Sequence, residues 1–263
     1  MSFIKVLKSI LPYPLINLLK KIRNRITSLE LTKIYKTKTG NYCLPLLSYQ
    51  DIIKEKIIND KIWGEFIYDI AKENIVEDSI VIDAGANFGQ LSILFSKIKK
   101  NVCVYSFESS KFIYKILKKN VELNNANVIP FNCVLGDEGD KLLQIKKGDL
   151  SEFSSWGSNK VKILSAEDTN YSSETVKAVK IDDLNFKNKI SFFKIDVQGY
   201  DLKVLYGAKK TILKHKMPIM FEYEKDFEKV FNYNFENFEN FIEEINYEIV
   251  KNIDNKNFLI KPK

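Results

Sequence analysis

Histidine is almost absent from this chain, which contains a single residue of this type, His215, set between two lysines. Only three cysteines occur, Cys43, Cys103 and Cys133, and no two of them have C-x-x-C spacing. A zinc site or a Ser-His-Asp triad would have to be built around one histidine. The sequence therefore argues against both kinds of site, and an odd number of cysteines in apolar surroundings fits buried thiols in a reducing cytoplasm.

Glycine and proline are also scarce, at 10 and 6 of 263 residues. No apolar run reaches the roughly 20 residues that a membrane-spanning helix needs, and no small-residue cleavage site follows the first apolar segment. Hydrophobic residues make up 45% of the chain, enough for a substantial core. We therefore expect one ordered domain of catalytic size in the cytoplasm, without long linkers.

Positive charge is concentrated near the N-terminus. The formal net charge is +7, of which residues 1–30 contribute +5, leaving +2 for the rest. So small an excess gives a weak electrostatic footprint, and no nucleic-acid partner is expected. Residues 1–25 combine basic positions with apolar ones at helical spacing, so we assign residues 1–50 to a basic amphipathic helical extension. Two interpretations stay open, peripheral contact with the inner membrane surface and a helix packed on its own domain; the sequence favours the second.

Residues 51–263 have the pattern of an α/β domain. A helical region at 51–77 precedes short apolar runs that alternate with amphipathic segments of helix length, which is typical of a mostly parallel sheet. Two final strand-like runs around a turn predict an antiparallel hairpin that closes the sheet. The predicted strands are 80–82, 102–107, 128–134, 192–197, 219–223, 247–251 and 257–261, and the later helices are 91–98, 112–123, 202–212 and 231–245.

One segment, residues 138–178, fits the alternating scheme poorly. It holds three glycines and a group of serines around Trp156. We interpret it as an inserted loop or ribbon near the substrate site, because loops at the carboxyl edge of such a sheet commonly shape that site. Trp156 is either a stacking surface for a substrate ring or an anchor that packs the loop on the core.

A glycine-rich turn follows the first predicted strand. Asp83, Gly85, Asn87 and Gly89 form a D-x-G-x-N-x-G pattern, with Ala86 inside it, between a buried strand and a helix. Glycines let the backbone approach a nucleotide-like ligand. A dinucleotide site would have G-x-G-x-x-G spacing, and Asp83 is unfavourable beside a pyrophosphate but favourable beside the amino group and sulfonium of S-adenosylmethionine. The turn therefore predicts a site for this methyl donor.

Two further acidic residues follow the next two strands. Glu108 comes about 20 positions after the turn, where a carboxylate accepts both ribose hydroxyls of a bound nucleotide. Asp137 ends the third strand, and we assign it to the adenine amino group; a simple Gly-Asp turn is an equally good explanation. The expected cofactor site thus comprises the glycine turn, Glu108 and Asp137.

The chain resembles the FkbM-type methyltransferases over about residues 41–224. The matching stretches are VIDAGANFG at 81–89, FE at 107–108, NVELNN at 120–125, FKIDVQG at 193–199, VLYGA at 204–208 and FE at 221–222. This resemblance implies a Rossmann-like class I fold with a seven-stranded sheet, S-adenosylmethionine as cofactor, and methylation of a hydroxyl oxygen, often on a sugar or polyketide. Two positions depart from the family pattern, since Gln198 and Asp201 stand where the family most often has glutamate.

These observations lead to one hypothesis on function with two alternatives. We expect an O-methyltransferase that acts on a glycan or another small hydroxylated metabolite. Asp196, at the end of the fourth strand, is the candidate base, because a carboxylate beside the acceptor can take the hydroxyl proton; a helix cap is its structural alternative. Trp156, Gln198 and Glu222 are candidate substrate residues, and no metal is expected. A non-catalytic binder of S-adenosylmethionine or a nucleotide, and a nucleic-acid methyltransferase, are the alternatives.

Overall fold

The computed structural model describes residues 32–46, 51–146 and 173–263. Its centre is a seven-stranded sheet with the order β11-β12-β10-β9-β3-β4-β5. The five strands from β10 to β5 are parallel, whereas β12 is antiparallel to both β10 and β11. The strands are β3 (Ile80–Ala84), β4 (Cys103–Glu108), β5 (Val128–Asn132), β9 (Ile190–Ile195), β10 (Ile219–Glu222), β11 (Tyr247–Ile253) and β12 (Asn257–Pro262). The predicted, mostly parallel sheet with a closing antiparallel hairpin is confirmed. The last strand, β12, lies between β10 and β11, so β11 forms the edge of the sheet.

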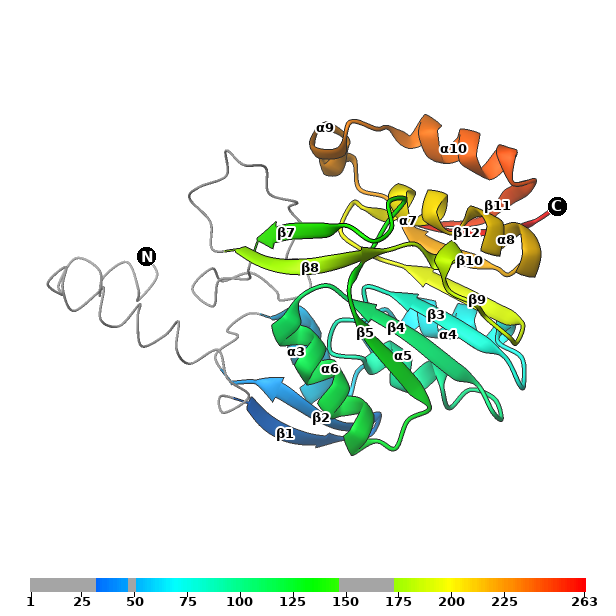
Figure 1. Cartoon of the computed structure of the whole chain (residues 1–263). Helices are drawn as coiled ribbons and strands as arrows, with labels where there is room; N and C mark the ends of the chain where they lie inside the picture. Colours follow the sequence, from blue (N-terminus) through cyan, green and yellow to red (C-terminus); the bar gives the residue numbers. More distant parts are fainter. Residues whose placement is uncertain (1–31, 47–50, 147–172) are drawn as a thin grey trace, which may run out of the picture.

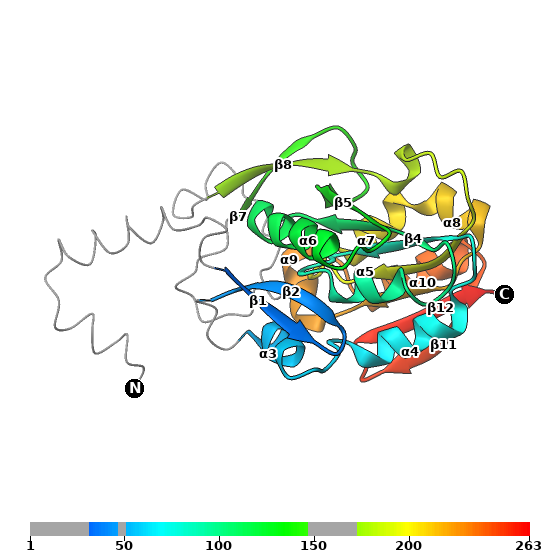
Figure 2. The ribbon, with the colours of Figure 1, turned by 90° about the horizontal axis from the view of Figure 1, so that it is seen from below.

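Helices cover both faces of the sheet (Figures 1 and 2). Side chains alternate along β3, so Val81 packs with one layer of helices while Ile80 and Ile82 pack with the other. The first layer consists of α4 (Glu65–Asn74), α5 (Gln90–Phe95) and α6 (Lys111–Leu123), and the second of α7 (Asp201–Gly207), α8 (Lys209–His215) and α10 (Phe235–Glu244). Two hydrophobic cores therefore hold the sheet between the layers, as expected for buried parallel strands.

The strand order reverses at β3, whose neighbours are β4 on one side and β9 on the other. In open α/β sheets, ligands bind outside the carboxyl ends of the strands at such a switch point. The glycine turn, residues 83–89, begins at the carboxyl end of β3. The topology thus puts this turn where the fold opens a crevice.

The prediction that residues 1–50 are helical is wrong for the part that the structure describes. Residues 32–46 contain a hairpin of β1 (Thr32–Thr37) and β2 (Gly40–Pro45), which pair antiparallel. Threonine, isoleucine and tyrosine favour strands, and Gly40 supplies the positive φ of the turn, +145°. The predicted amphipathic segment 1–25 lies outside the described residues.

The hairpin belongs to the α/β domain. Tyr42 and Leu44 are fully buried in the core formed with α4, α5 and α6. Asn120 on α6 accepts a hydrogen bond from the backbone N–H of Cys43 at 2.6 Å and donates one to the carbonyl of Phe88 at 2.8 Å. One buried amide therefore ties the hairpin, α6 and the glycine turn together.

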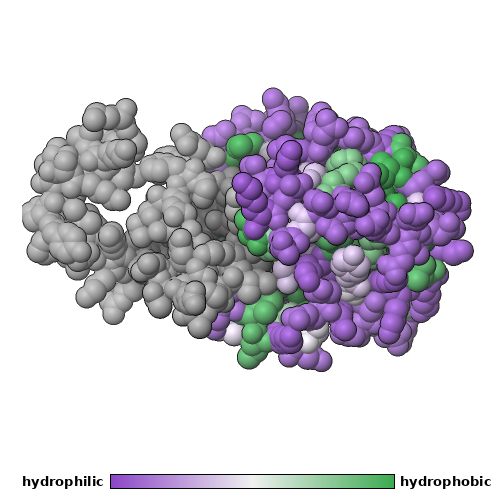
Figure 3. Space-filling model, turned by 90° about the horizontal axis from the view of Figure 1, so that it is seen from above, coloured by the Kyte–Doolittle hydropathy of each residue, from purple (hydrophilic) through white to green (hydrophobic). Residues whose placement is uncertain are grey.

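The helical region predicted for residues 51–77 is divided into α3 (Ile52–Ile58) and α4. Asp60 and Gly64 between the two helices have φ values of +60° and +66°, which no helix accommodates. Among the described residues, none of the helices has the length and apolar character needed to cross a membrane. On the face shown in Figure 3 the described surface is mostly hydrophilic, with apolar side chains in small separate groups.

Residues 134–146 and 173–179 lie outside the main sheet. A smaller sheet is formed by β6 (Val134–Leu135), β8 (Ser173–Val179) and β7 (Leu142–Lys146), in that order. The single strand predicted at 128–134 is therefore split, since β5 ends at Asn132 and β6 pairs with β8 instead. The described parts of segment 138–178 form an antiparallel ribbon. Trp156 lies outside the described residues.

Candidate active site

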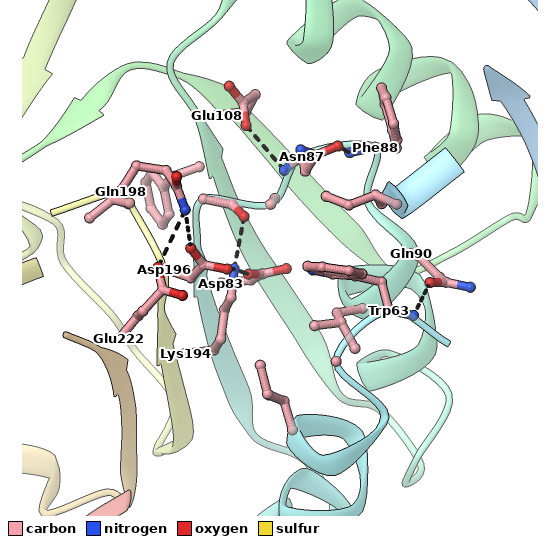
Figure 4. Close-up of a pocket in the computed structure, with 18 of the residues that line it drawn as sticks. Trp63, Asp83, Asn87, Phe88, Gln90, Glu108, Lys194, Asp196, Gln198 and Glu222 are labelled. Atoms are coloured by element: carbon pink, nitrogen blue, oxygen red, sulfur yellow. Dashed lines mark hydrogen bonds and ion pairs between the residues drawn. The ribbon is translucent and has the colours of Figure 1, made fainter. Parts of the chain in front are cut away.

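A cavity of about 1210 Å³ opens at the carboxyl ends of the central strands. It is lined by Asp83, Gly85, Ala86, Asn87, Glu108, Asp196, Gln198 and Glu222, which are eight of the eleven candidate site residues (Figure 4). Segments that lie more than 130 residues apart in the sequence therefore meet at one place. The parallel sheet explains this meeting, because all its strands end at the same edge.

The glycine turn is held tightly against its neighbours. Gly85 has φ +78°, and a Cβ there would lie 1.8 Å from the carbonyl oxygen of Asp196. Gly89 has φ +85°, and a Cβ there would lie 2.4 Å from Leu117 Cδ1. Gly89 thus shapes the turn without lining the cavity. Both positions need glycine for sterics and for backbone conformation.

Glu108 fastens the turn to the next strand. Its Oε2 accepts a hydrogen bond from the backbone N–H of Asn87 at 3.1 Å, and its Oε1 accepts one from Ser110 N–H at 2.9 Å. Burial raises the pKa of Glu108 to about 7, although these two N–H groups oppose the rise. Each carboxylate oxygen keeps a further lone pair toward the cavity, as a partner of ribose hydroxyls requires.

Asp83 does not face the cavity as an open charge, contrary to the electrostatic reasoning from the sequence. Its side chain is 1% exposed, its Oδ1 lies 3.1 Å from Lys194 Nζ, and its Oδ2 accepts a hydrogen bond from Ser92 at 2.5 Å. The cation beside Asp83 is thus a lysine of this chain. A buried carboxylate needs such a partner, which only the fold brings close.

Lys194 is the site residue that the sequence reasoning missed. Its Nζ donates to the carbonyls of Ala84 at 3.1 Å and Gly85 at 2.8 Å, and lies 3.9 Å from Asp196 Oδ2. Burial alone would lower the pKa of Lys194, but the two aspartates outweigh it and raise the pKa. A lysine between Phe193 and Ile195 in a strand of buried residues was a usable signal, since buried lysines are almost always paired.

Asp196, Gln198 and Glu222 gather at the ends of β9 and β10. The side-chain N–H groups of Gln198 donate to Asp196 Oδ1 at 3.1 Å and to Glu222 Oε2 at 3.3 Å. Burial, followed by the nearby charges of Asp196 and Asp201, raises the pKa of Glu222 to about 10. Glu222 is therefore a neutral acid near pH 7, hydrogen-bonded to Asp196. Figure 4 shows the amide of Gln198 above the two carboxyl groups.

Asp137, like Gly89, does not line the cavity, unlike the other predicted cofactor residues. Its Oδ2 forms a 2.8 Å ion pair with Lys203 of α7, and it is not among the residues that line the cavity. Gly136 packs against Gly207 of α7. A Cβ on Gly207 would lie 1.8 Å from the Gly136 carbonyl oxygen, so the chain at Gly136 runs close to α7. Cys133, Val134 and Leu135 line the cavity instead.

A second wall of the cavity comes from the N-terminal part of the domain. Trp63, from the segment between α3 and α4, lines the cavity together with Ile62 and Phe66. Its backbone N–H donates to Gln90 Oε1 at 2.9 Å, which fixes this segment to α5 (Figure 4). The sequence pattern indicated only a helix face here, because helical spacing does not distinguish a core residue from one that borders a cavity.

The sheet has seven strands with one antiparallel strand near its edge, and the glycine turn lies at its switch point, which is the arrangement expected of a Rossmann-like class I methyltransferase. The methyltransferase FkbM domain model matches residues 83–249, well over half of the chain. The chain therefore belongs to the FkbM methyltransferase family, as the sequence motifs predicted.

Similar proteins include two fungal methyltransferases and one crystal structure. Methyltransferase sdnD of Sordaria araneosa is 33% identical over 82 residues, 30% of this chain and 31% of that protein. Methyltransferase 1 of Beauveria bassiana (strain ARSEF 2860) is 24% identical over 171 residues, 59% of this chain and 68% of that protein. The methyltransferase FkbM structure from Methylobacillus flagellatus KT has 17% identity and a TM-score of 0.46, and the alignment covers 71% of this chain and 44% of that one. The chain thus spans about a third of the first relative.

Proposed function

We propose that this chain is an S-adenosylmethionine-dependent O-methyltransferase that acts on a hydroxyl group of a glycan or another small hydroxylated metabolite. One observation carries the proposal: the glycine turn with Glu108 and the carboxyl groups of Asp196 and Glu222 line the same cavity. A nucleotide-binding turn and a proton acceptor in one cavity are the two parts that such a transfer requires.

The residues around the turn fit the cofactor. Gly85 lets the turn lie directly against the Asp196 carbonyl while it also lines the cavity, and Glu108 has further lone pairs for the two ribose hydroxyls. Lys194 lies between Asp83 and Asp196, so this cluster of three charges has one negative charge in excess, on the cavity side at Asp196. That excess favours the positively charged amino and sulfonium groups of the cofactor. Gly85, Ala86, Asn87 and Glu108 would hold it.

We assign the role of the base to Asp196. Its side chain is 25% exposed, whereas Asp83 and Lys194 behind it are almost fully buried. When bound, S-adenosylmethionine supplies an electrophilic methyl group whose sulfur leaves as a neutral thioether. Asp196 would accept the proton of the acceptor hydroxyl on a carboxylate oxygen, so that the hydroxyl oxygen could take up the methyl group that the bound cofactor supplies. Positioning supplies the rest of the rate, since the methyl donor is already activated.

The acceptor side of the cavity suits a hydroxylated molecule. Trp63 and Phe66 offer aromatic surface, while Glu222, Glu224 and Lys256 offer donors and acceptors for hydroxyl groups. Stacking by Trp156 stays a prediction. Free thiols at Cys43, Cys103 and Cys133 suit a reducing cytoplasm, the compartment we propose. Contact of residues 1–25 with a membrane also stays a prediction.

Charge at the cavity weighs against a nucleic-acid acceptor. Among the described residues that line it, carboxylates outnumber lysines by eight to three. A phosphate backbone would be repelled by such a rim, because nucleic-acid affinity depends on neutralising phosphates. The lining carboxylates are Glu55, Glu65, Asp83, Glu108, Asp196, Glu222, Glu224 and Asp226, and the lysines are Lys56, Lys194 and Lys256.

Calorimetry followed by a transfer screen tests the proposal. We expect micromolar binding of S-adenosylmethionine and S-adenosylhomocysteine, and transfer of a labelled methyl group to an acceptor in a panel of glycans and hydroxylated metabolites. Absence of cofactor binding would refute the proposal. Binding together with transfer only to RNA would favour a nucleic-acid methyltransferase, and binding without transfer to any acceptor class would favour a non-catalytic binder.

A further inference from the structure

Gln198 connects two carboxyl groups that come from different strands. Asp196 follows β9 and Glu222 ends β10, and the amide of Gln198 donates to both, at 3.1 and 3.3 Å. A primary amide has two N–H groups, so one serves each carboxyl group. Glutamate at this position would have no N–H donor for either carboxyl group and would add a further negative charge to the cluster. Glutamine at position 198 therefore limits the negative charge of the cluster formed with Asp196 and Glu222.

The backbone holds Gln198 in an unusual conformation. Its φ is +56°, in the left-handed region that residues other than glycine rarely adopt, and Gly199 follows with φ +90°. A Cβ on Gly199 would lie 2.4 Å from the ring of Phe227, so this turn is packed closely. Tyr233 also donates its hydroxyl to the Gly199 carbonyl. Strained residues fixed by their surroundings cluster at functional sites.

The charged neighbours of the pair come from every element around it. Lys194 of β9 lies 3.9 Å from Asp196, and Asp83 of β3 lies behind that lysine. On the Glu222 side, Asp201 of α7 accepts a hydrogen bond from the Glu222 backbone N–H at 3.3 Å, and Glu224 pairs with Lys256. Asp201 is fully buried, and burial raises its pKa to about 7. Negative groups thus predominate, and this favours retention of a proton on the pair.

We propose that Gln198 is a positioning residue that holds Asp196 and Glu222 together as one proton-sharing pair, in which Glu222 keeps a proton and Asp196 carries the charge. The shared proton and the amide donors hold Asp196 in one orientation, with its charged oxygen toward the acceptor. Removal of the acceptor proton adds a second proton to the pair, and its release to water restores the starting state. This inference rests on the proposed function, but its test requires neither the cofactor nor an acceptor.

Carboxyl carbon NMR of the cofactor-free protein tests the pairing directly. With 13C-labelled aspartate and glutamate, we expect the Glu222 carboxyl group to stay protonated through pH 8, and the carboxyl carbon signals of Glu222 and Asp196 to respond to the same titration step, as in one coupled pair. Glu222→Gln and Asp196→Asn identify the two signals. In Asp196→Asn, the step of Glu222 should fall by about one unit or more, because its closest negative charge is gone. Ionisation of Glu222 in the ordinary range of a glutamate, without a response of the Asp196 signal, would overturn the proposal.

Variants of Gln198 separate positioning from mere packing. Gln198→Met keeps the length without the donors, and the pKa of Glu222 should fall by about one unit as the two carboxyl groups separate. Gln198→Glu should make the cluster of residues 196, 198 and 222 hold one additional proton at pH 7. It should also move the acidic limb of the pH dependence of kcat to higher pH. Gln144→Glu adds the same charge on the exposed face of β7 and should change neither. Unchanged steps in both Gln198 variants would show that Gln198 only packs.

Failure of this inference can be told apart from failure of the proposed function. The NMR steps need neither cofactor nor acceptor, so they decide the pairing even if no methyl transfer is found. Normal cofactor binding with independent carboxyl steps would leave the methyltransferase proposal standing and overturn the pairing. Paired steps without cofactor binding would do the reverse.

Discussion

Asp196 is the residue on which the proposed chemistry depends, and its environment is built from side chains distant in sequence. Lys194 approaches one of its oxygens and Gln198 donates to the other, while its own carbonyl packs against Gly85. Because the carbonyl and the carboxylate serve different purposes, a change of the side chain alone leaves the turn intact. The chemical role can therefore be separated from the structural role by conservative substitution.

Asp196→Asn should lower kcat by about 10²–10⁴-fold, since a general base contributes on that order. Cofactor affinity should fall much less than kcat, because the charge of Asp196 attracts the cofactor but no hydrogen bond of the turn uses this side chain. Parallel measurement of methyl transfer and of S-adenosylmethionine binding by calorimetry checks both parts. A loss of binding equal to the loss of rate would assign Asp196 to the cofactor site, and unchanged rate would leave it a structural carboxylate.

Glu108→Gln should weaken cofactor binding about 10-fold or more, because hydrogen bonds to charged groups are the stronger kind. For the native protein, affinity should fall as the pH drops through about 7, where Glu108 takes up a proton and loses acceptor capacity. Calorimetry between pH 6 and 8.5 measures this slope, and it should be absent in the variant. A slope that persists in Glu108→Gln would point to a different titrating group.

At the scale of elements, the hairpin and α6 act together on the glycine turn. The hairpin adds no strand to the central sheet, yet Tyr42 and Leu44 are as buried as core residues of the sheet. Asn120 joins three segments through one buried side chain, and Asn124 one turn later also bonds the hairpin, at Asn41. The position of the turn is thus set partly by residues far outside its own sequence.

Asn120→Ala should lower the free energy of unfolding by about 2 kcal/mol, because a buried N–H and a buried carbonyl lose their partners. Cofactor affinity should fall as well, since the Phe88 carbonyl lies inside the turn. Urea denaturation and calorimetry measure the two effects. Lys119→Ala is the neighbouring control on the exposed face of α6, where its ion pair with Glu122 is about half exposed and contributes little. Equal stability of both variants would contradict this role of Asn120.

For the molecule as a whole, several carboxyl groups in the cavity or next to it have a proton affinity that is raised by burial. The pKa of Glu108 and that of Asp201 rise to about 7, and that of Glu222 rises to about 10. In the unfolded chain these groups release their protons near pH 4, so the folded state binds more protons across the range between. Their contribution to the free energy of unfolding is complete below about pH 4. It is lost as the pH rises through the pKa values of the folded state, about 7 for Glu108 and Asp201 and about 10 for Glu222.

The free energy of unfolding of the cofactor-free protein should therefore decrease from pH 5 to pH 9. Urea denaturation at several pH values measures the decrease, which should become shallower in Glu222→Gln because this variant cannot release the proton. Lys209→Ala, at an exposed ion pair with Glu244, should leave the slope unchanged. A free energy that stays flat or rises over this range would contradict the assigned proton affinities.

Metal removal should not affect activity. Among the described residues, no group of three or more histidine, cysteine, aspartate or glutamate side chains has an arrangement that could hold an ion. Gln198 places an amide between two carboxyl groups, which weakens the site for a divalent cation. Methyl transfer after treatment with EDTA should equal that of the untreated protein, and restoration of a lost activity by magnesium would contradict this.

Much of the molecule could be predicted from sequence because the signals are local. Short apolar runs separated by amphipathic segments determine a parallel α/β sheet, and the spacing of Gly85, Asn87 and Gly89 determines a turn that a ligand can approach. The order of motifs determines the FkbM family. Each of these depends on the backbone conformation or periodicity of neighbouring residues, which a sequence states directly.

The tertiary structure decided what depends on contacts between distant residues. It paired Asp83 with Lys194, turned Asp137 toward Lys203 and joined Asp196 to Glu222 through Gln198. It also made residues 32–46 a hairpin where the sequence predicted a helix, because the pairing of β1 with β2 buries Tyr42 and Leu44 in the core formed with α6. Charge pairing and burial depend on which residues are neighbours in three dimensions. The sequence alone therefore identified the acidic residues, and the fold determined which of them face the cavity.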